Sequence, residues 1–145
     1  MAVILNIETS TKVCSVGLAI DGTTKVLQES HVANSHSELV TLYSEQVINE
    51  SGFSFADIDA IAVSMGPGSY TGLRIGVSTA KGFCFAINKP LIAIPTLKAM
   101  AAGMLELISD DNYLVCPMID ARRMEVYASV FDKDLQTVHK TEAVI

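Results

Sequence analysis

The chain has 145 residues, of which 50% are hydrophobic, and it carries a formal net charge of −6. That length suits one domain of ordinary size, or one domain and part of another, and the acidic balance excludes unaided binding to a nucleic-acid backbone. The sequence contains no run of about 18 apolar residues that could cross a membrane, and Glu8 interrupts the only early apolar run where a signal peptide would lie. We therefore expect no membrane association. We expect the excess of apolar residues to be buried in a sheet or in a subunit interface.

The cysteine content indicates a reducing compartment. The three cysteines are an odd number, and each lies within an apolar run, where a reduced thiol behaves as a small hydrophobic group: Cys14, Cys84 and Cys116. A cytoplasmic location is the expectation that follows.

The first half of the chain predicts three strands and then a helix. The strands are expected over residues 1–8, 13–20 and 24–32, and Asp21-Gly22 supplies the turn between the second and third. A helix is expected over residues 37–51, because apolar residues recur there at helical spacing, and Gly52 is a natural stop.

The second half alternates strands and helices. After a short strand over residues 59–65, a long helix is expected over residues 71–88, ended by Lys89-Pro90. A strand is then expected over residues 91–94, and a helix from Thr96, its expected cap, to about residue 108. The last expected elements are a strand over residues 113–119, a turn over 120–123 and a strand over 124–131. Hairpins followed by helix-linked strands predict an α/β domain with a mixed sheet flanked by helices. We expect a first subdomain over residues 1–110 and a truncated second subdomain over residues 111–145.

The most informative motif is glycine-rich and lies between a strand and a helix. It reads Gly66-Pro67-Gly68-Ser69-Tyr70-Thr71-Gly72-Leu73-Arg74-Ile75-Gly76. One interpretation is a tight turn in which Ser69 or Thr71 caps the helix, and the other is a remnant cradle whose backbone N–H groups face a phosphate. We favour the turn.

The long helix carries a stripe of small residues at intervals of four, namely Gly72, Gly76, Ala80 and Cys84. Small side chains let another element approach closely. The stripe would pack either against the chain's own sheet or against a helix of another subunit.

Three motifs together resemble the TsaB (YeaZ) family, which shares the fold of actin, sugar kinases and Hsp70. They are Ile7-Glu8-Thr9-Ser10, the glycine-rich motif, and Ile119-Asp120-Ala121-Arg122-Arg123 with Glu125-Val126-Tyr127. The resemblance implies a noncatalytic subunit that binds the TsaD-type enzyme and supports N6-threonylcarbamoyladenosine formation at position 37 of tRNAs that read ANN codons. It further implies a homodimer when the chain is alone, a TsaE-type ATPase as another candidate partner, tRNA contact only through the complex, and no cofactor.

The same resemblance assigns two sets of residues. Vestigial nucleotide or phosphate loops would comprise Glu8, Thr9, Ser10, Gly66, Gly68 and Ser69. A partner interface on the two N-terminal helices would comprise Leu39, Tyr43, Val47, Gly72, Leu73, Arg74, Gly76, Val77, Ala80 and Lys81, and the interface interpretation of the small-residue stripe is favoured on this ground.

Two departures from TsaD argue against catalysis. Where TsaD has a His-x-x-x-His pair on a helix, this chain has Thr96 and Met100, and neither can replace an imidazole metal ligand. Where TsaD has acidic residues after the first strand, this chain has Lys12, whose charge opposes magnesium binding. The histidines, His31, His36 and His139, are scattered, and surface or cap roles are expected for them. We expect no metal site and no catalytic residue.

Two enzymatic alternatives stay open at this point. A metal-dependent glycoprotease-like peptidase would need a metal with an open position, or a nucleophile beside a base. A small-molecule kinase or ATPase would need a carboxylate near the phosphates, and Glu8 is the sole candidate at the first loop. Asp120, Arg122 and Arg123 suggest a catalytic or RNA-contact role, but a solvated turn is favoured for them.

Overall fold

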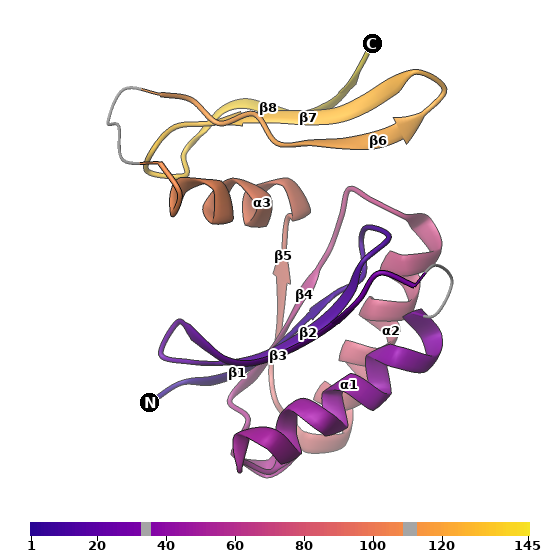
Figure 1. Ribbon diagram of the computed structural model, residues 1–145, viewed down its shortest axis with the longest axis vertical. Coiled ribbons are helices and arrows are strands. Elements are labelled where there is room, and N and C mark those ends of the chain that lie inside the picture. The colour runs from indigo at the N-terminus through magenta and orange to yellow at the C-terminus, as the bar shows by residue number, and fades with distance from the viewer. Residues whose placement is uncertain (33–35, 109–112) are drawn as a thin grey trace. The chain divides into compact units, whose positions relative to one another are not determined.

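The computed structural model describes residues 1–32, 36–108 and 113–145, which form two compact units (Figure 1). Unit 1 comprises Met1–Met65 and Ser69–Ala93, and unit 2 comprises Gly66–Gly68 and Ile94–Ile145. The subdomain boundary expected at residue 110 lies outside the described residues. Among the helices that are described, none is both long and apolar enough to cross a membrane.

Unit 1 is built on a five-stranded mixed sheet of order β3-β2-β1-β4-β5. The strands are β1 (Val3–Glu8), β2 (Cys14–Ile20), β3 (Thr23–Ser30), β4 (Ala60–Ser64) and β5 (Leu91–Ile94). Strand β2 is antiparallel to both β1 and β3, whereas β4 is parallel to β1. The predicted hairpins followed by helix-linked strands are therefore confirmed.

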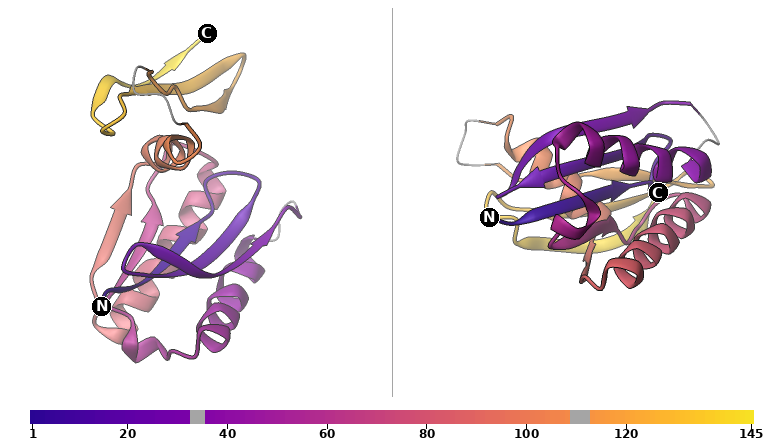
Figure 2. Two further views of the ribbon diagram at one scale, coloured as in Figure 1. Left: turned by 60° about the vertical axis from the view of Figure 1, so that its left-hand side comes forward. Right: turned by 90° about the horizontal axis from the view of Figure 1, so that it is seen from below.

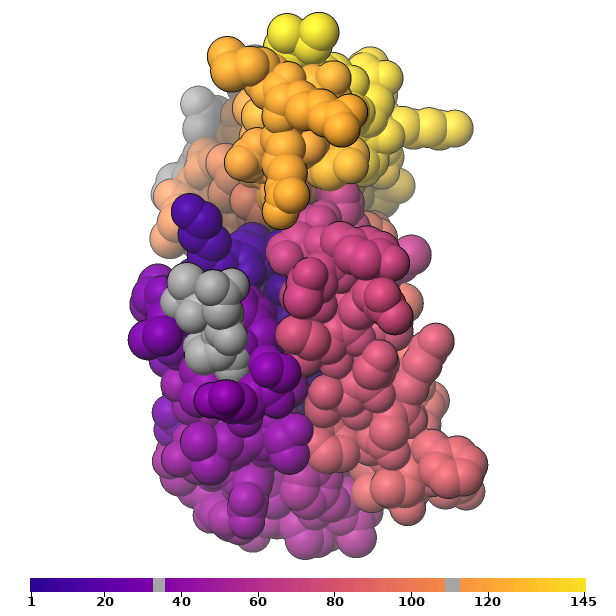
Figure 3. All heavy atoms as spheres, turned by 90° about the vertical axis from the view of Figure 1, so that its right-hand side faces the viewer, coloured from indigo at the N-terminus to yellow at the C-terminus, as the bar shows by residue number. Residues whose placement is uncertain are grey.

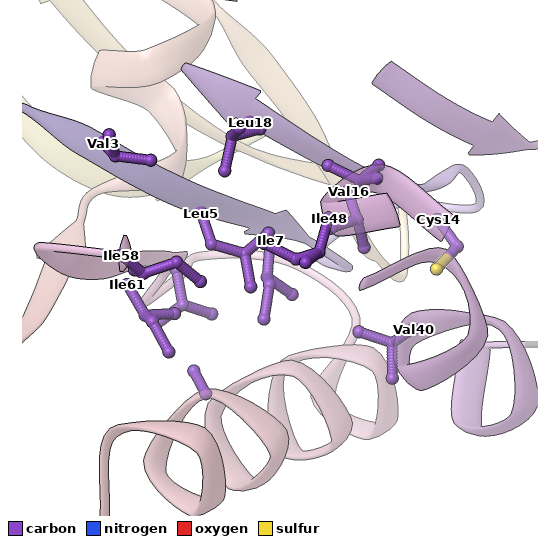
Figure 4. Packing of buried hydrophobic residues seen from close by; sticks show 13 residues of the cluster. Val3, Leu5, Ile7, Cys14, Val16, Leu18, Val40, Ile48, Ile58 and Ile61 are labelled. Carbon is purple, nitrogen blue, oxygen red and sulfur yellow. The ribbon is translucent and has the colours of Figure 1, made fainter. Parts of the chain in front are cut away.

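Two helices, α1 (His36–Ser51) and α2 (Tyr70–Ile87), pack on the same face of this sheet (Figures 1 and 2). Alternate residues of β1 point toward the helices, because successive side chains of a strand project to opposite faces. The core under the helices is formed mainly by Val3, Leu5, Ile7, Val16, Leu18, Val40, Ile48, Ile58 and Ile61 (Figure 4). A short 3-10 helix, η1 (Phe55–Asp57), precedes β4.

The described residues of unit 2 form one helix, α3 (Thr96–Leu105), and a three-stranded antiparallel sheet. The sheet contains β6 (Met118–Arg122), β7 (Glu125–Phe131) and β8 (Thr137–Val144), with β7 in the middle. Leu97 and Ala101 of α3 join Val115 and Phe131 in a second hydrophobic core. Each unit thus has a core of its own.

The structure corrects the sequence prediction in unit 2. A strand was expected over residues 113–119, but regular pairing begins at Met118, and Val115 forms only an isolated bridge with Phe131. Pro117 has no N–H group to donate, which explains why the ladder starts after it. The expected turn at 120–123 is displaced, because Asp120 and Arg122 belong to β6. Strand β8 was not predicted, since almost all of its residues are exposed and it shows no alternation.

Candidate functional site

The loop between β1 and β2 packs against the first two turns of α2. Thr9 is fully buried, and its Oγ1 donates a hydrogen bond to the carbonyl oxygen of Gly72 at 2.8 Å. A Cβ atom added at Gly72 would overlap the Thr9 carbonyl oxygen, and one added at Gly76 would overlap Thr9 Oγ1. Because the loop approaches the helix so closely, both of these helical positions require glycine.

The N-terminus of α2 is satisfied by the chain itself. Ser69 is the N-cap, and its Oγ accepts a hydrogen bond from the N–H of Gly72 at 3.2 Å. The Ser69 N–H in turn donates to the carbonyl oxygen of Ser10 at 2.6 Å. Ser69 therefore caps α2, as the turn interpretation of the glycine-rich motif predicts.

The carboxylate of Glu8 serves the same loop. Its Oε1 accepts a hydrogen bond from the N–H of Ser10 at 2.6 Å, and its Oε2 accepts one from the hydroxyl of Ser64. A carboxylate at this position disfavours a second anion beside the loop. The Ser10 hydroxyl is buried and has no hydrogen-bond partner among the described residues.

The Cys14 thiol, at the start of β2, is not activated as a nucleophile. Burial raises its pKa, and the nearby negative charge of Glu8 raises it further. Cys14 therefore stays protonated at neutral pH, and a thiol is a poor nucleophile compared with a thiolate.

Two other residues of the expected phosphate loops belong to unit 2. Gly66 and Gly68 have φ angles of 108° and 157°, which glycine adopts readily. The carbonyl oxygen of Gly66 accepts a hydrogen bond from the N–H of Thr96 at 2.8 Å, at the first turn of α3. Thr96 is not the cap that the sequence predicted, since Pro95 precedes it at that position and the buried Thr96 hydroxyl has no partner among the described residues.

The small-residue stripe does not lie on an exposed surface, contrary to the interface interpretation. Gly72, Gly76 and Ala80 are buried, and the spacing of four directs them toward Thr9 and the sheet. Val47, which was expected in the same interface, is fully buried in the core. These four residues are already covered by their own chain.

The other residues assigned to the interface differ in exposure. Leu39, Tyr43 and Val77 are half-buried and pack against the core of unit 1, and Leu73 is also half-buried. Arg74 and Lys81 are exposed on the outer side of α2.

Sequence reasoning missed two exposed aromatic residues and one buried histidine. Tyr70 and Phe85 are 74% and 90% exposed on α2, and the Arg74 guanidinium lies over the Tyr70 ring at 5.4 Å. His36 was expected to have a surface or cap role, but it is buried at the start of α1, with Nε2 3.0 Å from the carbonyl oxygen of Thr11. A tertiary contact of this kind leaves no signal in the sequence pattern.

The remaining polar candidates are dispersed. His31 lies 3.5 Å from Glu29 and His139 lies 3.6 Å from Glu142, both at the surface. Lys12 and Met100 are exposed as well. In the described part of the chain, no group of three or more His, Cys, Asp or Glu side chains could hold a metal ion.

Arg122 and Arg123 lie at the tip of the β6–β7 hairpin. Arg122, Arg123 and Met124 have left-handed φ angles of 66°, 55° and 65°, and the Arg122 N–H donates to Asp120 Oδ1 at 2.8 Å. Both arginine side chains are exposed, as a solvated turn requires.

A mixed sheet that opens with an antiparallel meander and has helices packed on it defines an α/β domain of the actin-like class. A putative N-acetylglucosamine kinase from Porphyromonas gingivalis shares this fold, with a TM-score of 0.50 and 14% identity over 100% of this chain and 47% of that one. That likeness concerns the fold alone.

Closer similarities define the family. The model of the family "TsaD: tRNA N6-adenosine threonylcarbamoyltransferase" matches residues 28–144. The Escherichia coli tRNA threonylcarbamoyladenosine biosynthesis protein TsaB is 36% identical over 98% of this chain and 62% of its own length. A solved Pseudomonas aeruginosa protein, described as similar to the peptidase YeaZ, superposes with a TM-score of 0.90 at 26% identity, over 99% of this chain and 67% of that one.

The chain therefore belongs to the family that the TsaD model describes, and within it to the TsaB (YeaZ) family. It spans about three fifths of the length of the curated relative from Escherichia coli.

Proposed function

We propose that this chain is a noncatalytic, cytoplasmic subunit that docks on a TsaD-type enzyme and supports threonylcarbamoyladenosine formation in tRNAs that read ANN codons. The observation that carries this proposal is that the chain itself fills the space between the β1–β2 loop and α2. Thr9 occupies the space at Gly72 and Gly76, and Glu8 accepts the hydrogen bonds of Ser10 and Ser64. The relatives named for threonylcarbamoyladenosine biosynthesis support the pathway.

The docking surface in this proposal is the outer side of α1 and α2, which lie side by side on one face of unit 1 (Figure 3). Helix α1 contains Glu38, Glu45 and Glu50 and no basic residue other than His36, whereas α2 contains Arg74 and Lys81 and no acidic residue. The described residues include no ion pair that joins the exposed Arg74 or Lys81 to a carboxylate, so both charges are open to a partner.

Charge reversal on α2 tests the proposed complex. We expect the unaltered chain to bind a TsaD-type enzyme in isothermal titration calorimetry, and the double variant Arg74→Glu/Lys81→Glu to bind at least tenfold more weakly, because rim charges contribute about 1 kcal/mol each. The matched control is Lys25→Glu/Lys98→Glu, which changes net charge equally at exposed positions of β3 and α3. Absence of binding by the unaltered chain at micromolar concentration refutes the proposal.

The same surface is self-complementary, which supports a homodimer when the chain is alone. Glu38 and Glu45 lie seven positions apart on α1, and Arg74 and Lys81 lie seven positions apart on α2. Each pair therefore spans about two helical turns, a distance of about 10.5 Å along the helix axis. In a twofold dimer, α1 of one copy could face α2 of the other with matched charges.

Sedimentation velocity of paired variants tests the homodimer. Glu38→Lys/Glu45→Lys should weaken the dimer because it places like charges opposite each other. Adding Arg74→Glu/Lys81→Glu to the same chain should restore the dimer, because both helices then have reversed charges. A monomeric wild-type chain, or a fourfold variant that does not recover, contradicts the arrangement.

The absence of bond-making activity is also part of the proposal, as is contact with tRNA only through the complex. A TsaE-type ATPase would be a further component. Assays of the isolated chain for ATP turnover and for chelator-sensitive cleavage of casein are expected to be negative. A positive result in either assay contradicts the noncatalytic assignment.

A further inference from the structure

Three consecutive residues of the β1–β2 loop bind two different helices. Thr9 bonds to Gly72 of α2, and the Ser10 carbonyl oxygen accepts from the Ser69 N–H at the cap of α2. The next carbonyl oxygen, that of Thr11, lies 3.0 Å from Nε2 of His36, which is the first residue of α1. The loop therefore connects the N-terminal ends of both helices.

The His36 contact has a defined direction. A backbone carbonyl oxygen can only accept, so Nε2 carries the proton and donates it to Thr11. His36 is only 9% exposed, so little water competes for this bond. The histidine thus holds α1 to the loop at a position where the helix starts.

The loop is also fixed internally. The Ser10 N–H is held by Glu8 Oε1, and the Val13 N–H donates to Thr11 Oγ1 at 3.2 Å. Consecutive Cα atoms are about 3.8 Å apart, so the three anchoring residues span only about 7 Å. A short segment with both ends and its middle anchored transmits a displacement instead of absorbing it.

We propose that the Thr9–Thr11 loop is a positioning element that couples the N-terminal ends of α1 and α2, with His36 as the positioning residue on the α1 side. The consequence for binding rests on the proposed function, in which α1 and α2 carry the docking surface. Because the loop fixes the ends of both helices before binding, it presents that surface preorganised to a partner. A TsaD-type enzyme then binds without having to order the two helices.

Two amide variants of His36 separate the hydrogen bond from the volume of the side chain. Gln places its amide nitrogen near the position of the imidazole Nε2, whereas Asn places it near Nδ1 and falls short of Thr11. His36→Gln should therefore behave like the unaltered chain, and His36→Asn should not. Rescue by Gln is not expected if His36 only fills space.

The first readout is amide hydrogen exchange at Ser69, the N-cap of α2, which bonds to Ser10 of the loop. In His36→Asn the Ser69 N–H should exchange about fivefold faster or more, because it is protected by the Ser10 carbonyl oxygen and the neighbouring Thr11 is no longer held by α1. Leu5, in the middle of the sheet, is the internal control and should be unchanged. Equal Ser69 protection in all three chains refutes the coupling.

The second readout is affinity for the TsaD-type enzyme, measured by calorimetry with the three chains. We expect His36→Gln to match the unaltered chain within about twofold, and His36→Asn to bind about five- to tenfold more weakly. Equal affinity of His36→Asn and the unaltered chain overturns the claim that the loop preorganises the docking surface. If the unaltered chain does not bind at all, the proposed function fails, and the exchange at Ser69 still decides the coupling.

Discussion

Gly76→Ala tests the contact between the first loop and α2 most directly. A methyl group at this position would overlap Thr9 Oγ1, so the Thr9 side chain must move and lose its hydrogen bond to Gly72. Leaving a buried hydroxyl unpaired costs about 1–3 kcal/mol, and inserting a carbon into a filled site costs about 1–3 kcal/mol. Alanine regains about 1 kcal/mol through its higher helix propensity. The net loss of unfolding free energy should be about 1–5 kcal/mol.

Gly82→Ala is the matched control on the same helix. No atom lies within 4 Å of a Cβ added at Gly82, so this variant should be stabilised by about 0.5–1 kcal/mol from propensity alone. Urea unfolding followed by far-UV circular dichroism measures both variants. With a slope of about 2 kcal/mol per molar urea, Gly76→Ala should unfold at about 0.5–2.5 M less urea than the unaltered chain, and Gly82→Ala at slightly more. If Gly76→Ala is as stable as Gly82→Ala, the close approach of Thr9 is refuted.

Three further predictions concern the thiols, a surface carboxylate and nucleotides. Iodoacetamide at pH 8 should label the exposed Cys116 first, because burial raises the pKa values of the Cys14 and Cys84 thiols. Urea should abolish this difference in labelling rate. Fast labelling of Cys14 in the folded chain would contradict the prediction. The hydrogen bond from the Ser54 hydroxyl lowers the pKa of Asp57. Its stabilisation of the fold is therefore fully present above the ordinary carboxyl pKa, and it is lost as the pH falls through the lowered pKa of Asp57. An NMR titration should place the Asp57 midpoint below its ordinary value, and Ser54→Ala should raise it. ATP or ADP should give no calorimetric heat and no thermal shift, whereas micromolar binding would show that the first loop accepts a phosphate.

The local elements of unit 1 were predictable because their signals are local. Asp21-Gly22 between two alternating runs indicates a hairpin, and Ser69 before an apolar helix indicates an N-cap. The structure places a turn and a cap at these residues. The glycine-rich motif is also one of the three motifs that carry the family resemblance.

The contacts that define the site were not predictable, because they join distant segments. The spacing of Gly72 and Gly76 shows that something approaches α2 closely, but it does not reveal that Thr9 of the same chain fills that space. The contact of His36 with Thr11 depends in the same way on tertiary packing. In unit 2, the missed β8 has exposed residues at nearly every position, so no alternation marks it as a strand.

The anchors at Thr9, Ser10 and Thr11 make the spacing between β1 and β2 a structural constraint. One residue inserted anywhere within this triplet would separate neighbouring anchors, so at least one of the two helices would lose its partner. A deletion would have the same effect. Loop grafts and epitope tags in this protein are therefore better tolerated at the solvent-exposed Asp21-Gly22 turn.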